Sequence, residues 1–432
     1  MDAWIARRGA GVGGRISVPG DKSVSHRAMM LGGLAEGVTR VTGFLDSEDC
    51  LATLGAMRAM GVSIDRPART EVVVHGVGLR GLKAPSGPLD MGNAGTAMRL
   101  FTGLLAGQAF DTELVGDSSL MRRPMERVAV PLRRMGATIE TRDGRPPVRI
   151  TGSRALSGID WRLEVASAQV KSAILLAGLY ASGVTTVTEP AVTRDHTERM
   201  LRAFGVPVES VGFTARLTPA PLSAANVAVP GDFSSAAFFI VAALVAGRGP
   251  LTIANVGVNP TRTGLLDILR LMGARIEIAE PRLAGDEPVA DLVVHPGPLR
   301  GIAVPPELVP LAIDEFPVLF AAAAVAEGET LVTGAAELRV KESDRIAVMA
   351  EGLRSLGTDA EPLPDGMRIR GGRLGGGHVH SHGDHRIAMS FAVAATRAEG
   401  DVRIDDVANV ATSFPGFLAV AGAAGIAVQP LT

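Results

Sequence analysis

The sequence holds a single cysteine and few aromatic residues among its 432 positions. One thiol cannot form an internal disulfide, so we expect a protein of the reducing cytoplasm. The 13 Phe, 2 Trp and 1 Tyr are few for the stacking platforms of nucleic-acid binding. The 43 basic and 45 acidic residues nearly cancel, giving a formal charge of −2. We therefore expect neither nucleic acid nor an anionic membrane surface as a partner.

Long hydrophobic runs are also missing. The longest apolar stretches, at 238–247 and 319–326, are too short to span a bilayer. Residues 1–14 contain arginines and glycines but no apolar core of a signal peptide, so we expect none. Hydrophobic residues nevertheless make up 47% of the chain, and its 52 glycines and 27 prolines are scattered. This composition predicts a soluble, well-packed protein with many short turns.

A sequence pattern recurs six times along the chain, at intervals of 68 to 84 residues. In each copy, a segment with the periodicity of an amphipathic helix ends in an apolar residue and a glycine, and a short predicted strand follows. A glycine just past a helix end is the usual stop signal. The six glycines are Gly61, Gly136, Gly205, Gly273, Gly357 and Gly425.

Upstream of each stop signal lies a second helical segment, polar at its start and then apolar all round. A helix without a polar face is buried on every side. These segments lie near 22–34, 93–105, 167–177, 232–245, 313–326 and 385–395. Segments that predict β-strands surround these helices. The predicted fold class is therefore α/β, built from βαβαββ-type units with one buried and one outer helix each.

The length suggests two domains, which gives three units to each. The tripeptide Pro-Gly-Asp occurs at 19–21 and again at 230–232, and we place hinges near 20–21 and 230–231. One domain would then be 21–230, and the other 1–20 plus 231–432. A cleft between them would collect the polar starts of the buried helices.

The polar starts carry several cations and hydroxyls, which suits an anionic ligand. Lys22, Ser23 and Arg27 would add a cation, a hydroxyl and a guanidinium to the free N–H groups of a helix N-terminus. Arginines at several starts suggest bidentate binding of oxyanions. Simpler interpretations remain open: Asp314 could be only a helix cap, and the charges at 341–345 could pair on a helix surface.

A histidine-rich stretch offers a different chemistry. His378, His380, His382 and His385, with Asp384, could form a metal site, although an exposed histidine-rich loop is the favoured interpretation. Cys50 lies among apolar residues of a helix and is expected in the core.

Seven motifs occur along the chain: PGDKSVSHR at 19–27, GNAGTAMR at 92–99, RRPM at 122–125, SAQVKS at 167–172, IDEFP at 313–317, RVKESDR at 339–345 and DHRIAM at 384–389. Together they resemble the 3-phosphoshikimate 1-carboxyvinyltransferase (EPSP synthase) family, in the same order and over essentially the whole chain. The form of the fourth motif is similar to the class II bacterial branch. The resemblance implies two inverse α/β domains of enolpyruvyltransferase type.

The resemblance also implies an activity. The enolpyruvyl group of phosphoenolpyruvate would be transferred to the 5-hydroxyl of shikimate 3-phosphate, with release of phosphate, on the pathway to chorismate and aromatic amino acids. The enzyme would need no metal or organic cofactor and would act as a cytoplasmic monomer.

The resemblance assigns site residues by motif position. Shikimate 3-phosphate would contact Lys22, Ser23, Arg27, Ser167, Ala168, Gln169, Arg194, Asp314 and Lys341. Phosphoenolpyruvate would contact Lys22, Asn93, Gly95, Arg123, Gln169, Glu342, Arg345 and Arg386. Asp314 would accept the hydroxyl proton, with Lys22 and Glu342 as candidates for proton transfer at the enol carbon.

The chain departs from the family pattern at two positions and matches inhibitor-sensitive members at a third. Thr412 stands where many members have a phosphoenolpyruvate-binding lysine, and Glu337 replaces an asparagine. Gly95 is the glycine of glyphosate-sensitive members.

Three alternative functions are considered. The enolpyruvyltransferase acting on UDP-N-acetylglucosamine shares the fold, but it normally has a reactive loop cysteine, and Cys50 is in the wrong place for that role. A metal-dependent hydrolase could use the histidines, and a non-catalytic module could simply bind anions.

Overall fold

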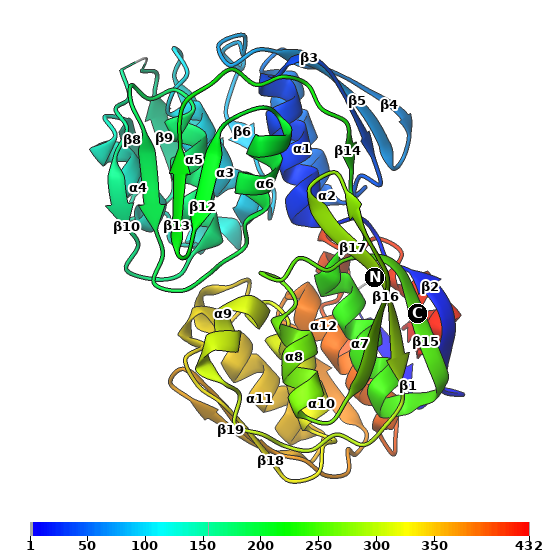
Figure 1. Cartoon of the computed structure of the whole chain (residues 1–432). Coiled ribbons are helices and arrows are strands. Elements are labelled where there is room, and N and C mark those ends of the chain that lie inside the picture. The colour runs from blue at the N-terminus through cyan, green and yellow to red at the C-terminus, as the bar shows by residue number, and fades with distance from the viewer. Residues whose placement is uncertain (1–2, 154, 432) are drawn as a thin grey trace. The chain divides into compact units, whose positions relative to one another are not determined.

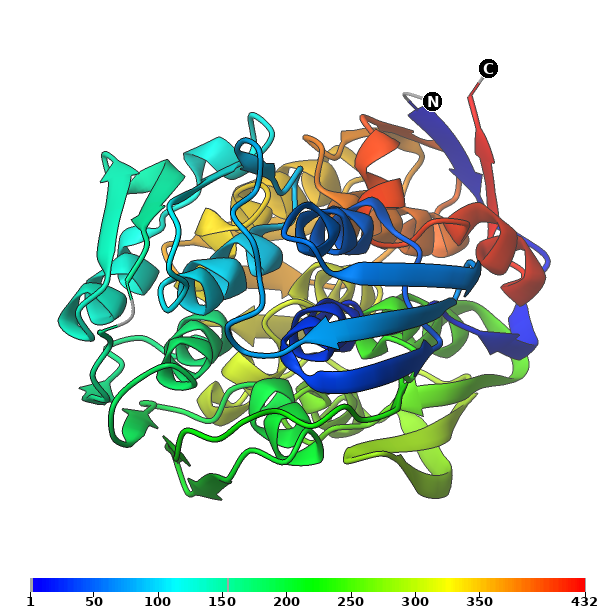
Figure 2. The ribbon, with the colours of Figure 1, turned by 90° about the horizontal axis from the view of Figure 1, so that it is seen from above.

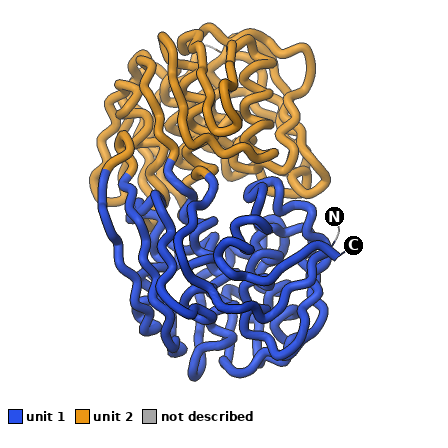
Figure 3. The backbone as a smooth tube through the Cα atoms, turned by 90° about the vertical axis from the view of Figure 1, so that its right-hand side faces the viewer, with its two compact units in different colours: residues 1–19, 230–282, 288–432 blue, residues 20–229, 283–287 orange. Residues whose placement is uncertain are grey.

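The computed structural model describes residues 3–153 and 155–431, and the chain divides into two compact units. Unit 1 comprises Met1–Pro19, Pro230–Arg282 and Pro288–Thr432, and unit 2 comprises Gly20–Val229 with Leu283–Glu287 (Figure 3). Each unit has its own hydrophobic core. Among the described residues, no helix has the length and hydropathy to cross a membrane.

Unit 2 repeats one arrangement three times, with a small sheet, a buried helix and an outer helix in each copy (Figure 1). The first copy contains α1 (Lys22–Leu34), β3 (Glu36–Thr42), α2 (Glu48–Ala59), β4 (Ser63–Ala68), β5 (Glu71–Val77) and β14 (Val227–Ala228). The second contains β6 (Leu89–Asp90), α3 (Gly95–Leu105), β7 (Thr112–Val115), η1 (Leu120–Arg122), α4 (Glu126–Arg134), β8 (Thr138–Arg142) and β9 (Arg145–Thr151). The third contains β10 (Asp160–Arg162), α5 (Ala168–Gly178), β11 (Thr185–Thr188), α6 (His196–Ala203), β12 (Val208–Val211) and β13 (Thr214–Leu217).

Unit 1 contains three further copies. The first has β2 (Val12–Ser17), α7 (Phe233–Ala246), β15 (Gly247–Gly257), α8 (Gly264–Leu271), β16 (Arg275–Ala284) and β17 (Glu287–His295). The second has η2 (Pro306–Leu308), α9 (Val309–Ala312), α10 (Phe316–Ala323), β18 (Glu329–Val332), η3 (Ala336–Val340), α11 (Arg345–Ser355), β19 (Asp359–Leu363) and β20 (Gly366–Arg370). The third has β1 (Ala3–Arg7), β21 (Gly377–His380), α12 (His385–Ala394), η4 (Ala395–Arg397), β22 (Val402–Asp405), η5 (Ala408–Thr412), α13 (Phe417–Ala424) and β23 (Ala427–Pro430).

The three sheets of unit 2 share one strand pattern. In the order β14-β3-β5-β4, the first pair is parallel and the next two are antiparallel, and β6-β7-β9-β8 and β10-β11-β13-β12 follow the same rule. In unit 1 the N-terminal strand β1 lies between β22 and β23, so strands from both ends of the chain lie side by side (Figure 2). The predicted α/β class and its repeated units are confirmed.

The helices also agree with the sequence pattern. All six expected buried helices are present, and twelve of the fourteen residues of α7 are buried. The six stop-signal glycines all have positive φ, between 85° and 101°, the left-handed conformation that glycine adopts without strain. Cys50 is fully buried in α2, as predicted.

One helix was predicted too long. The segment expected to be helical over 313–326 forms α10 only over Phe316–Ala323. Pro317 lies in the first turn of α10, where its missing N–H is tolerated, but without that N–H it cannot donate to the carbonyl of Ile313, so no continuous α-helix runs through this point from residue 313. Asp314 therefore lies in the turn before α10 while Glu315 takes the cap position, and the interpretation of Asp314 as the helix cap is wrong.

Candidate active site

The start of α1 holds a cation against a carboxylate. Asp21 caps the helix by accepting a hydrogen bond from the Val24 amide at 2.9 Å, which fixes the first turn. Lys22 follows, and its Nζ atom lies 2.9 Å from Oδ2 of Asp49 in the first turn of α2. The Lys22 side chain keeps 19% of its surface exposed, whereas that of Asp49 keeps only 7%. Asp49 therefore orients a lysine that solvent or a ligand can still reach.

Arg27, one turn further along α1, is almost fully buried. Its guanidinium donates to Thr197 Oγ1 at 2.6 Å, to Ser172 Oγ at 2.9 Å and to the Ser23 carbonyl at 2.9 Å. Burial lowers the pKa of Arg27 to about 10, so the group remains charged at neutral pH. Because these partners are neutral oxygens, the arrangement keeps a positive charge beneath Ser23, where a phosphate would gain from it.

A second cluster joins the starts of α3 and α5. Arg99 donates to Gln169 Oε1 at 2.7 Å, and Gln169 in turn donates to Thr96 Oγ1 at 2.9 Å. Arg123 donates to Asn93 Oδ1 at 2.6 Å. A Cβ atom on Gly95 would lie 2.8 Å from Nη1 of Arg123 and 3.2 Å from Nη1 of Arg99. Glycine at 95 thus lets two guanidinium groups approach the helix start.

Lys171, in the motif at 167–172, lies near the start of α5 but is directed into the protein. Its side chain is only 3% exposed and contacts Glu189 at 2.7 Å and Glu198 at 2.8 Å. Burial alone would lower its pKa, but the two carboxylates raise it above the usual value. Lys171 is therefore engaged within the protein.

In unit 1, Arg345 is the centre of a buried charge network. Its Nε lies 2.8 Å from Asp384 Oδ2, and one Nη lies 2.7 Å from Glu342 Oε2. Although burial would lower its pKa, the neighbouring carboxylates raise it above the ordinary arginine value. The other amino group, Nη1, has no hydrogen-bond partner among the described residues. The side chain is 1% exposed, so surface pairing does not explain this motif.

Asp314 lies next to that group. Its Oδ1 is 3.6 Å from Nη1 of Arg345 and 3.5 Å from Nζ of Lys341. Arg386 donates to the backbone carbonyl of Asp314 at 3.0 Å and lies 3.6 Å from Glu315. The turn before α10 is thus held from three sides by cations, with the Asp314 carboxylate at the centre.

The two units offer complementary chemistry. The helix starts of unit 2 carry Lys22 and Arg27 in one cluster and Arg99 and Arg123 in the other, a cationic set suited to anions. Those of unit 1 bring the carboxylates of Asp314, Glu342 and Asp384 beside Lys341, Arg345 and Arg386. A carboxylate placed in this way is chemically suited to accept a proton as a general base.

Several remaining site residues also have defined places. Ser167 caps α5, with Ala168 as the first helical residue, and Arg194 is half-buried just before α6. Thr412 is buried, and its hydroxyl donates to the Asn409 carbonyl at 2.7 Å. It supplies no positive charge at the position where many family members have a lysine. Glu337 lies 3.9 Å from Lys341.

The histidine stretch is mostly exposed, although His385 is buried. His378 contacts Asp405, and the rings of His380 and His382 lie 4.5 Å apart. Within the part of the chain that the structure describes, no three metal-ligating side chains are grouped as a metal site would require.

Some functional partners were missed in the sequence. Asp49, Ser172 and Thr197 orient Lys22 and Arg27, but they come from other helices. Asp49 looked like an ordinary acidic residue at a helix start. The sequence showed only that polar residues occur on buried helices, and it did not show which side chain each of them contacts.

Comparison with solved structures defines the class of protein. The enolpyruvyl transferase NikO of Streptomyces tendae superposes with a TM-score of 0.80 at 18% identity, over 99% of this chain and 98% of that one. The chain therefore has the enolpyruvyl transferase fold.

The family follows from closer matches. An EPSP synthase of Acinetobacter baumannii superposes with a TM-score of 0.88 at 53% identity, over 99% of both chains. The 3-phosphoshikimate 1-carboxyvinyltransferase of Alkalilimnicola ehrlichii is 63% identical over 98% of this chain and 95% of its own length, and that of Methylococcus capsulatus is 60% identical over 97% and 98%. The model of the EPSP synthase (3-phosphoshikimate 1-carboxyvinyltransferase) family matches residues 6–420, and the chain belongs to this family. It is a transferase of the shikimate pathway whose reaction moves the enolpyruvyl group of phosphoenolpyruvate to shikimate 3-phosphate.

Proposed function

We propose that the two sets of helix starts carry out this reaction as one active site, with unit 2 supplying most of the anion binding and unit 1 the proton transfer. The observation that supports this division is the pairing of a cationic set in unit 2 with carboxylates held among cations in unit 1. Both substrates of the family are small molecules that carry several negative charges, and arginine forks match their phosphate and carboxylate groups.

Each substrate has its own proposed residues. Shikimate 3-phosphate is bound by Lys22, Ser23, Arg27, Ser167, Ala168, Gln169, Arg194, Asp314 and Lys341. Phosphoenolpyruvate is bound by Lys22, Asn93, Gly95, Arg123, Gln169, Glu342, Arg345 and Arg386. The unsatisfied Nη1 of Arg345 supports its assignment, because a buried donor without a partner is costly unless a ligand engages it.

The proposed chemistry is addition followed by elimination. A proton from Lys22 or Glu342 is added to the methylene carbon of phosphoenolpyruvate, and the 5-hydroxyl oxygen attacks the adjacent carbon while Asp314 accepts the hydroxyl proton. In the second step the C–O bond to phosphate breaks, the methyl group loses a proton, and the enol ether remains. Orientation and charge stabilisation supply most of the acceleration.

Domain closure is proposed as part of catalysis. Apart from the short excursion at Leu283–Glu287, the chain passes between the units at residues 19–20 and 229–230, beside the two Pro-Gly-Asp tripeptides, and we place hinges near 20–21 and 230–231. Substrates that contact residues of both units would favour a closed, water-poor state. We further propose that the enzyme works as a cytoplasmic monomer.

The direct test is phosphate release from phosphoenolpyruvate, measured with and without shikimate 3-phosphate. Release that requires shikimate 3-phosphate supports the proposal, and release that is indifferent to it refutes the proposal. UDP-N-acetylglucosamine in place of shikimate 3-phosphate tests the alternative acceptor in the same assay. Unchanged activity after treatment with a chelator would remove the metal-dependent hydrolase.

A second experiment separates catalysis from anion binding. Asp314→Ala should lower kcat by at least about 100-fold, the usual contribution of a general base, while shikimate 3-phosphate still binds. The matched control is Glu351→Gln, which removes an exposed carboxylate on α11. Equal kcat values for Asp314→Ala and the control would refute the catalytic role.

A further inference from the structure

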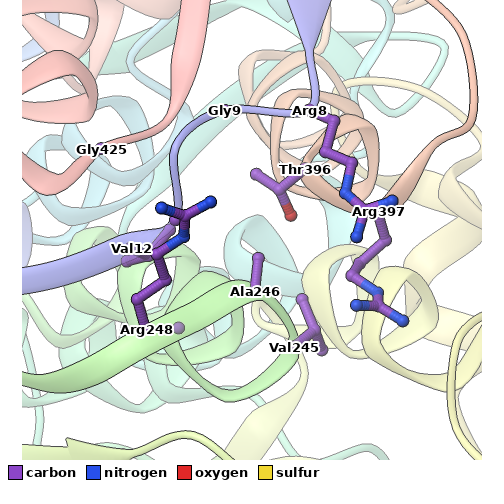
Figure 4. Close-up of a pocket in the computed structure, with 11 residues that line it drawn as sticks. Arg8, Gly9, Val12, Val245, Ala246, Arg248, Thr396, Arg397 and Gly425 are labelled. Carbon is purple, nitrogen blue, oxygen red and sulfur yellow. The ribbon is translucent and has the colours of Figure 1, made fainter.

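Unit 1 contains a small polar pocket far from the helix starts. It lies at the C-terminal ends of α7 and η4, beside the turn between β1 and β2, and has a volume of about 180 Å³ (Figure 4). Its charged lining residues are Arg8, Arg248 and Arg397, one from each of three chain segments. Because α7 has 14 residues and rises 1.5 Å per residue, the pocket is about 20 Å from the N-terminal end of that helix.

The three arginines have no carboxylate partner in the part of the chain that the structure describes. None of them makes a hydrogen bond or ion pair there, although each guanidinium carries five N–H donors. The acidic residues next to Arg397 in the sequence are already engaged: Glu399 lies 3.5 Å from Arg373, and Asp401 lies 3.0 Å from Arg7. The pocket therefore concentrates three positive charges with no internal counter-charge.

Glycine allows one of these arginines to lie over the pocket wall. A Cβ atom on Gly11 would come within 2.2 Å of Cγ of Arg248, so the arginine stem rests directly on the glycine backbone. Gly11 also has a φ of +108°, which a residue with a side chain rarely adopts. The hydroxyl of Thr396 points into the same space in Figure 4 but donates its proton to the Val393 carbonyl at 2.6 Å. The side-chain donors that the pocket offers are thus the guanidinium groups.

Helix dipoles account for only part of this arrangement. The C-terminal end of a helix favours a cation by roughly 0.3–1 kcal/mol, which gives a reason for one arginine at each helix end. It gives no reason for Arg8, which comes from the β1–β2 turn, and all three arginines are exposed, so their guanidinium donors are open to water or to a ligand.

We propose that this pocket is a second anion site, which takes a tetrahedral oxyanion such as phosphate, sulfate or the phosphate group of a small phosphomonoester. Three guanidinium forks suit several acceptor oxygens at once. The volume is below the 300 Å³ or so at which pockets usually hold drug-sized or nucleotide ligands, so the ligand is small. The site is separate from the substrate-binding residues, and the proposal does not depend on their roles.

The test counts bound phosphate on the full-length protein. Equilibrium dialysis with labelled inorganic phosphate is carried out at constant ionic strength on the wild type and on Arg248→Ala/Arg397→Ala. The double variant should bind one phosphate fewer per chain, and each single variant should bind that phosphate at least about tenfold more weakly. Arg373→Ala, which removes an exposed arginine already paired with a carboxylate, should bind as the wild type does.

The location is checked directly in crystals soaked in selenate, whose anomalous signal marks a sulfate-like anion. Signal between Arg8, Arg248 and Arg397 in the wild type, and none in the double variant, supports the site. Equal phosphate stoichiometry in the wild type and the double variant, or an empty pocket in the soaked crystal, overturns the proposal. Equal displacement of phosphate by chloride and by sulfate at matched ionic strength also overturns it, because it would show charge screening alone.

Discussion

A methyl group at residue 95 provides a sharp test of the site in unit 2. In Gly95→Ala the new Cβ would lie 2.8 Å from Nη1 of Arg123, closer than ordinary contact allows. The guanidinium must retreat by about 0.6 Å to regain normal van der Waals distance. Since Arg123 is held by Asn93 at 2.6 Å, this movement loosens a hydrogen bond and displaces a charge that the proposed function assigns to phosphoenolpyruvate.

The expected size follows from the strength of such bonds. A hydrogen bond from a charged group contributes roughly 1.5–3 kcal/mol, and a partial loss near 1.4 kcal/mol is about tenfold in affinity. We therefore expect the KM for phosphoenolpyruvate to rise about tenfold. The inhibition constant for glyphosate should rise by at least as much, because the methyl group also takes space beside Arg123. Inhibition should remain competitive with phosphoenolpyruvate in the wild type.

Steady-state kinetics with both ligands measure these changes. Gly87→Ala is the matched control, since Gly87 is exposed and a Cβ there meets no atom within 4 Å. If the effect acts through Arg123, Gly95→Ala should raise both constants much less when Arg123 is already replaced by lysine, in Arg123→Lys. The reasoning would be refuted if Gly95→Ala left the KM for phosphoenolpyruvate and the inhibition constant for glyphosate within twofold of the wild type. It would also be refuted if Gly95→Ala raised both constants equally in the wild-type and Arg123→Lys backgrounds.

Three further predictions concern the charges buried in unit 2. Asp49→Asn removes the partner of Lys22 and should lower kcat/KM for phosphoenolpyruvate about tenfold in steady-state assays; an unchanged value would contradict the orienting role of Asp49. Lys171→Met leaves Glu189 and Glu198 without their cation and should cost about 3–5 kcal/mol in urea unfolding, whereas a loss below about 1 kcal/mol would contradict the buried network. Burial, with the charges of Lys22 and Arg27, lowers the pKa of His26 to about 3, so the unfolded chain binds the extra proton below its ordinary pKa near 6.5. Stability from His26 is therefore complete above pH 6.5 and should fall by about 1.4 kcal/mol for each pH unit toward pH 4, a slope that His26→Gln should lack.

The sequence predicted the features that depend on local signals. Helical segments that are apolar on all sides predicted the buried helices, and the glycines now seen in the left-handed conformation, such as Gly61 and Gly357, predicted the ends of the outer helices. These signals act within one turn of chain, so they can be read without knowing the tertiary structure.

The sequence could not predict which charges pair with each other. Lys171 and Arg345 are both basic residues near helix starts, yet the carboxylates around Lys171 come from residues 189 and 198 and satisfy it completely within the core. Arg345 also has carboxylate partners but keeps one donor unsatisfied beside Asp314. The pocket of Arg8, Arg248 and Arg397 joins segments hundreds of residues apart, so its charge density exists only in the folded unit.

The position of β1 between β22 and β23 has a consequence for synthesis on the ribosome. The three sheets of unit 2 are complete once residue 229 has been made, but the last sheet of unit 1 needs both the first strand and the final four-residue strand of the chain. At typical translation speeds of about 5–20 residues per second, the remaining 200 or so residues take roughly 10–40 s. Strand β1 must wait through that time without its partners, whereas β2 can already pair with β15, so a nascent chain stalled near residue 400 would have a folded unit 2 and a protease-sensitive first strand.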